Sequence, residues 1–165
     1  MSPNDAAWQA AYRRLESPLF NVLLRMLWDA SEAEDVLHDA FLRLWDQRER
    51  VRLDGIEALV YHTALNLARN RLRWRTLRQW VGLDDAPELT SVADPEQAQR
   101  LHELQRVLAS MPKRLRETLL LSEFGGLSTR EIAAVLGIAE GTVGSRKHAA
   151  LNFLRQHWNS ANESV

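Results

Sequence analysis

The sequence predicts an all-α protein in which two small helical domains are joined by a flexible linker, the second domain containing a helix-turn-helix. Apolar residues recur with helical spacing along most of the 165-residue chain, which holds only seven glycines and five prolines. No segment alternates with the period of two that is typical of strands. Residues 81–94 lose the helical spacing and become polar and acidic. A flexible linker of that length has an r.m.s. span of roughly 20 Å, enough to hold the domains apart.

The predicted N-terminal domain spans residues 6–80 and contains three helices. Ser31 and Glu34 have the Ser-x-x-Glu spacing of a capping box, so we expect the second helix to begin there. Asp54-Gly55 is typical of a turn and precedes the third helix. The three helices are expected over about residues 6–28, 31–48 and 56–78.

The predicted C-terminal domain spans residues 95–160 and begins at a helix cap. Asp94 can cap a helix whose first turn carries Pro95. Ser128 and Glu131 form another capping box, which opens the first helix of the helix-turn-helix. The helices before this motif are expected over about residues 95–111 and 113–124.

The segment from Gly126 to His148 has the pattern of a helix-turn-helix. Ala133 is small enough to let the two helices approach closely, Gly137 permits a left-handed turn between them, and Val143 is spaced to fill the interior. An ordinary helical hairpin with a glycine cap is the alternative. The other apolar residues of the predicted interior are Ile132, Leu136 and Ile138.

The second helix of the motif would face DNA with polar side chains. Arginine reads guanine edges and hydroxyl groups hold phosphates in such helices. Gly144 costs this helix about 1 kcal/mol relative to alanine, and the stretch carries only two cations. We therefore expect weak binding by this helix alone. The candidate DNA-binding residues are Thr142, Ser145, Arg146 and Lys147.

Residues 35–47 form a helix with one broad apolar face and an acidic face opposite to it. Asp35, Asp39 and Asp46 fall within about 40° of one another around the helix axis. Leu42 lies among them. This face is either a solvated acidic surface with one stray leucine or a docking surface for a basic partner that Leu42 contacts.

A row of nucleic-acid-compatible side chains follows the helix predicted over residues 56–78. His62, Asn66, Arg69 and Arg73 lie within about 60° of each other, and the apolar residues beside them turn toward the core. Arginine charges can hold phosphates and the amide can read base edges. The alternative is an exposed arginine-rich helix end that favours the helix dipole. A second row is predicted from Arg71, Arg75 and Arg78, with Trp74 nearby.

The composition excludes several classes of function. The chain has no cysteine, so we expect neither disulfides nor thiolate chemistry, and its net charge of -1 argues against coating nucleic acid through bulk charge. The five histidines are scattered, His38-Asp39 has no second ligand set, and no phosphate-binding glycine loop is visible. We expect no enzyme, metal or cofactor. Neither a signal peptide nor a membrane-spanning run is visible, so a cytoplasmic protein is expected.

Three segments together resemble a bacterial extracytoplasmic-function sigma factor, the RNA polymerase specificity subunit that contains regions 2 and 4 only. The resemblance covers roughly residues 10–158. Its segments are AEDVLHDAFLRLW for region 2.2, LVYHTALNLARNRLRWR for regions 2.3 to 2.4, and MPKRLRETLLLSEFGGLSTREIAAVLGIAEGTVGSRKHAAL for region 4.

The resemblance implies a binding role for each of the three surfaces. The first would bind core RNA polymerase at the coiled coil of its largest catalytic subunit, through Asp35, Asp39, Leu42 and Asp46. The second would recognise and help to melt the minus-ten promoter element, through Asn66, Arg69 and Arg73. The third would read the minus-thirty-five element in duplex DNA, with region 4 near the polymerase flap. Members are often held inactive by an anti-sigma factor.

The main alternative is a stand-alone helix-turn-helix transcription regulator. It explains the C-terminal domain equally well but leaves the acidic and basic rows of the first domain without a task. A helical adaptor that inhibits another factor is also conceivable. If the chain is a sigma factor, the low positive charge of the reading helix is explained. Polymerase holds both domains on one promoter, so the second contact becomes intramolecular and weak binding by one helix is sufficient.

Overall fold

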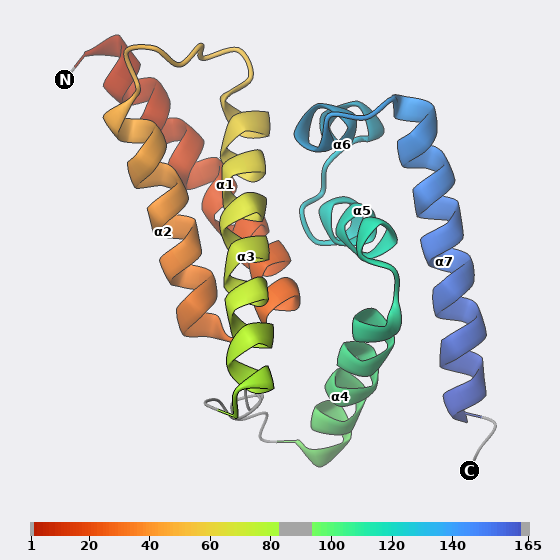
Figure 1. The fold of residues 1–165 in the computed structure, drawn as a ribbon. Helices are drawn as coiled ribbons and strands as arrows, with labels where there is room; N and C mark the ends of the chain where they lie inside the picture. The colour runs from red at the N-terminus through yellow and green to blue at the C-terminus, as the bar shows by residue number, and fades with distance from the viewer. Residues whose placement is uncertain (1, 83–93, 163–165) are drawn as a thin grey trace. The chain divides into compact units, whose positions relative to one another are not determined.

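The computed structural model describes residues 2–82 and 94–162, with side chains up to residue 158, and these residues form seven helices and no strand (Figure 1). The chain divides into two compact units, residues 1–89 and 90–165. The all-α prediction is confirmed. Most of the expected linker, residues 83–93, lies outside the described residues.

The first unit is a bundle of α1 (Pro3–Leu27), α2 (Ala30–Asp46) and α3 (Ile56–Trp80), each of which contacts the other two (Figure 1). The apolar positions of all three helices converge on one core, in which Leu19, Leu23 and Tyr61 are fully buried. Truncating one such leucine to alanine costs about 2–5 kcal/mol. Because the core uses one face of each helix, the outer faces of α2 and α3 are available for binding.

Helix α2 begins earlier than the sequence predicts. Its cap is Asp29, whose Oδ1 accepts a hydrogen bond from the backbone N–H of Glu32 at 3.0 Å. The capping box expected from Ser31 and Glu34 is therefore wrong. Trp28 closes α1 in the left-handed conformation with φ of 54°, so Asp29 is the first extended residue that can cap the next helix.

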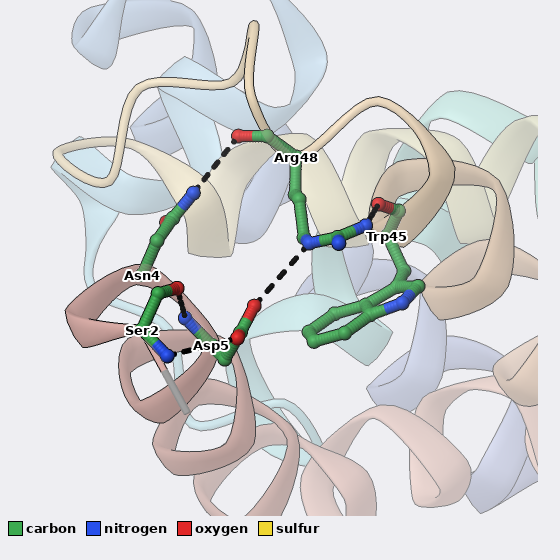
Figure 2. Close-up of polar contacts among 5 residues, drawn as sticks. All are labelled: Ser2, Asn4, Asp5, Trp45 and Arg48. Carbon is green, nitrogen blue, oxygen red and sulfur yellow. Dashed lines mark hydrogen bonds and ion pairs between the residues drawn. The ribbon is translucent and has the colours of Figure 1, made fainter.

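The N-terminus is fastened to the end of α2 by a polar cluster (Figure 2). Ser2 and Asp5 form a capping box that the sequence analysis missed. Arg48 Nε lies 3.3 Å from Asp5 Oδ1, and Asn4 donates from Nδ2 to the Arg48 carbonyl oxygen at 3.3 Å. The backbone N–H of Ser2, aided by its hydroxyl and Arg48, holds the pKa of Asp5 below its ordinary value. The cluster joins the start of α1 to the residues that follow α2.

The second unit contains α4 (Pro95–Ser110), α5 (Lys113–Glu123), α6 (Thr129–Leu136) and α7 (Glu140–Asn162). Helix α7 packs on the other three. The capping box of Ser128 and Glu131 is confirmed, with hydrogen bonds of 3.1 and 3.2 Å. Gly137 has φ of 66°, the left-handed turn that the helix-turn-helix requires.

Candidate binding surfaces

The row expected on α3 lies on the surface as a hydrogen-bonded ladder. Asn66 Nδ2 lies 3.1 Å from His62 Nε2, and Arg69 Nη1 donates to Asn66 Oδ1 at 2.9 Å. Because arginine occupies the amide oxygen, the amide nitrogen is left to donate and the imidazole Nε2 accepts. Arg73 continues the row one turn later and is exposed. The ladder presents a guanidinium and an amide in fixed positions.

The apolar residues beside this ladder are buried, as the sequence predicts, which fixes the orientation of α3. Tyr61, Ala64 and Ala68 are fully buried and Leu65 nearly so, while Leu72 is half-buried. The ladder lies roughly 115° around the helix axis from this buried face. The ladder therefore lies on a flank of α3, where His62, Asn66 and Arg73 are exposed and Arg69 is half-buried.

The second arginine row is not a continuous free surface, because Arg71 and Arg75 are half-buried beside Glu32 while Arg78 and Trp74 are exposed. Arg75 Nη1 donates to the Leu27 carbonyl oxygen at 2.7 Å, and its guanidinium pairs with Glu32. Arg71 lies 3.9 Å from the same carboxylate. A cation at the last carbonyls of a helix is favourable. Arg75 thus joins α3 to α1 and α2, a structural role that the sequence did not reveal.

The acidic row of α2 lies on the outer face of the helix, as predicted. Asp35 and Asp46 are exposed, and Asp39 is half-buried and bonded to Arg43 Nε at 3.1 Å. The Leu42 side chain is 62% exposed, an unusual position for a large apolar group. An acidic row with an exposed leucine at its centre is suited to contact a partner that carries basic and apolar side chains.

The structure separates the four candidate residues of α7. Thr142 and Ser145 are exposed, although the Ser145 hydroxyl donates to the Gly141 carbonyl oxygen at 3.0 Å. Arg146 and Lys147 are half-buried. Lys147 lies about 160° around the helix from Ser145 at ideal helix geometry. Ser145 and Lys147 therefore cannot contact base edges in the same groove at the same time.

A second ladder on α7 was missed by the sequence analysis. His148 Nε2 lies 3.3 Å from Asn152 Nδ2, and Arg155 Nη1 lies 3.5 Å from Asn152 Oδ1. The signal that could have found it is the repeated spacing His-x3-Asn-x2-Arg, present once in each unit. Ser145 and His148 are about 60° apart, so this ladder continues the exposed face of the reading helix.

No group of three or more potential metal ligands occurs among the described residues. Within the same part of the chain, none of the helices has the length and apolar content needed to cross a bilayer.

Comparison with known proteins identifies the family. The model for sigma-70 region 2 matches residues 11–78, and the model for sigma-70 region 4 matches residues 101–154. An ECF RNA polymerase sigma factor, SigL of Mycobacterium tuberculosis, is 31% identical over 155 residues, which cover 91% of this chain and 88% of the relative. The chain belongs to the extracytoplasmic-function sigma factors. It is a sigma factor with regions 2 and 4, as the resemblance implied.

Two solved structures share the fold of this sigma factor. CnrH, solved in complex with the cytosolic domain of CnrY, has a TM-score of 0.74 and 20% identity, covering 96% of this chain and 91% of that one. RpoE of Bartonella quintana, in complex with the anti-sigma factor NepR, has a TM-score of 0.69 and 20% identity, covering 92% and 96%. Sigma factors bind RNA polymerase and promoter DNA and are non-enzymatic initiation factors, so this chain directs transcription initiation.

Proposed function

We propose that the first unit of this sigma factor docks on core RNA polymerase with α2 and recognises the minus-ten element with α3. The observation that carries the proposal is the separation of the two surfaces. The acidic row lies on α2 and the ladder lies on α3, each pointing away from the shared core. One bundle can therefore hold polymerase and DNA at once.

The α2 surface suits a basic protein partner. Its carboxylates attract cations and disfavour DNA phosphates, and Leu42 adds apolar contact area at the centre of the row. We propose the coiled coil of the largest catalytic subunit as this partner, through Asp35, Asp39, Leu42 and Asp46.

The α3 surface suits DNA that is partly unpaired. The guanidinium of Arg69 and the amide of Asn66 lie in register along the helix, with Arg73 one turn further. Arginine can hold the phosphates while an amide reads a base edge. We propose that His62, Asn66, Arg69 and Arg73 contact the minus-ten element as it melts.

The second unit is proposed to read the minus-thirty-five element in duplex DNA. Thr142 and Ser145 would enter the major groove with Arg146 at its edge, and Lys147, on the far side of the helix, could add only a phosphate contact. The ladder on α7 ends at Arg155, about 15 Å along the helix from Ser145. The major groove is about 12 Å wide, so a helix that enters it at Ser145 has reached the phosphate backbone by Arg155. Phosphate contact by Arg155 follows from that position.

Further expectations follow from the family. We propose that region 4 also lies near the polymerase flap, that the chain acts in the cytoplasm with polymerase, and that it catalyses no reaction. One neighbour of the same fold was solved with an anti-sigma factor, so we propose that a protein of this kind can cover the same surfaces here.

Charge reversal at Asp46 tests docking most cleanly. Asp46 is the last residue of α2, where a cation favours the helix dipole, so Asp46→Arg cannot fail by melting the helix. We expect it to abolish binding to core polymerase and run-off transcription. Glu123→Arg reverses an exposed carboxylate at the last residue of α5, in the other unit, and should keep both. Equal activity of the two variants would contradict the docking proposal.

A further inference from the structure

An aromatic cavity of about 390 Å³ lies between α1 and α2 and shares only Leu42 with the surfaces described above. Trp8, Tyr12, Phe41 and Trp45 form its walls. Gln9, His38 and Leu42 complete the lining, and Gln9 and His38 are exposed. This volume is at the lower end of pockets that hold small ligands, so the cavity suits one side chain better than a helix.

The walls of the cavity are held open by their own contacts. Phe41 meets Tyr12 edge-to-face at 4.8 Å between ring centroids, and Trp45 meets Trp8 in the same manner at 6.5 Å. The Arg48 guanidinium lies over the Trp45 ring, with its central carbon 4.4 Å from the ring centroid. Because these side chains are already ordered in the free protein, a ligand that enters the cavity does not pay the entropic cost of ordering them.

The N-terminal cluster fixes this wall (Figure 2). Arg48 donates from Nη1 to the Trp45 carbonyl oxygen at 3.1 Å while its Nε faces Asp5. The start of α1 therefore sets the position of the indole at the end of α2.

The cavity opens beside the acidic row of α2. Leu42 belongs to both, and His38 at the rim lies about 80° around the helix from the middle of the aspartate row, with Phe41 and Trp45 further round. A basic partner on the acidic row would therefore reach the cavity with a neighbouring side chain. A second copy of this chain fits poorly, because a two-fold contact here would set two acidic rows against each other.

We propose that the cavity receives one apolar side chain of the polymerase coiled coil while basic side chains of that coiled coil pair with the acidic row. This inference rests on the proposed docking of α2. Buried aromatic pockets beside polar contacts are where binding energy concentrates in protein interfaces. The acidic row then attracts polymerase, and the cavity adds apolar contact to the same interface.

Filling the cavity tests the proposal. Gln9→Trp and His38→Trp place an indole at its rim from exposed positions, and Ala10→Trp adds the same group on another exposed face of α1. We expect the two filling variants to raise the Kd for core polymerase at least about tenfold. The control should bind as the wild type does, and all three should melt as the wild type does.

The outcomes separate this inference from the docking proposal. If Asp46→Arg loses binding while Gln9→Trp and His38→Trp keep it, the cavity inference is wrong and docking stands. If Asp46→Arg keeps binding, both are wrong.

A second measurement uses the unaltered chain, so that variant folding plays no part. Diethyl pyrocarbonate should modify His38 in the free protein and spare it in the complex with core polymerase. His102, exposed on α4, reports general reactivity in both. Equal modification of His38 in both states would overturn the proposal.

Discussion

Arg73 and Arg75 are two positions apart on α3, yet their surroundings give them different tasks. Arg73 is exposed, whereas the Arg75 side chain is only 17% exposed and is bound to Leu27 and Glu32. Periodicity placed both on an arginine-rich helix but could not distinguish them, because the partners of Arg75 lie 43 and 48 positions away. Only the packed bundle reveals such contacts.

Replacement of each arginine separates stability from binding. Arg75→Ala removes a charge-assisted hydrogen bond, so we expect a free energy of unfolding lower by about 1–3 kcal/mol. Arg73→Ala removes the same charge from the exposed row and should leave thermal melting unchanged while weakening promoter opening. Thermal melts and permanganate footprinting measure the two effects. Equal melting of the two variants would argue against the structural role of Arg75.

Asn66 provides a second prediction for a single residue. Asn66→Ala removes the centre of the ladder and the proposed base contact, so open-complex formation should fall by the equivalent of about 1–3 kcal/mol. Gln79→Ala is the matched control, because Gln79 is an exposed amide of the same helix that lies about 140° around the axis from Asn66. If both variants open the promoter as well as the wild type, Asn66 makes no such contact.

The Asp5 cluster gives a prediction for pH. The folded pKa of Asp5 is below its unfolded value. Its contribution to stability is therefore complete above the unfolded pKa, about 3.9, and is lost as pH falls through the folded pKa. Asp5→Asn should lower the Tm at pH 7, and the two Tm values should converge below about pH 4. A constant difference across this range would contradict the assignment.

At the scale of helices, the sequence predicted most of the fold and only part of each surface. The stops at Asp54-Gly55, Met111-Pro112 and Gly137 were found because they depend on local backbone chemistry. The start of α2 was misplaced because the left-handed Trp28 leaves no signal in the sequence. The cavity was missed because its lining comes from two helices whose register only packing sets.

Helix α7 gives a prediction at this scale. Arg155→Ala should weaken promoter binding by the holoenzyme a few-fold for any minus-thirty-five sequence and reduce the salt slope by about one, as expected for one phosphate contact. Arg100→Ala removes an exposed arginine from α4 and should change neither. An unchanged slope for Arg155→Ala would restrict the DNA surface to the start of α7.

At the scale of the whole molecule, each surface is modest by itself. The start of the reading helix has two exposed hydroxyl residues and two half-buried cations, and the net charge of the chain is -1. Low charge restrains non-specific phosphate binding, which increases steeply with the number of phosphates neutralised. Polymerase that carries both units would make the second contact intramolecular and can add about 10² to 10⁴ in avidity. Promoter specificity is then a property of the holoenzyme and not of either unit alone.

The most direct test is the affinity of the chain for promoter DNA with and without core polymerase, at about 0.15 M salt. We predict that the free chain binds promoter and unrelated DNA about equally and weakly, and that core polymerase produces tight binding to the promoter alone. Nanomolar, sequence-specific binding by the free chain would contradict the account.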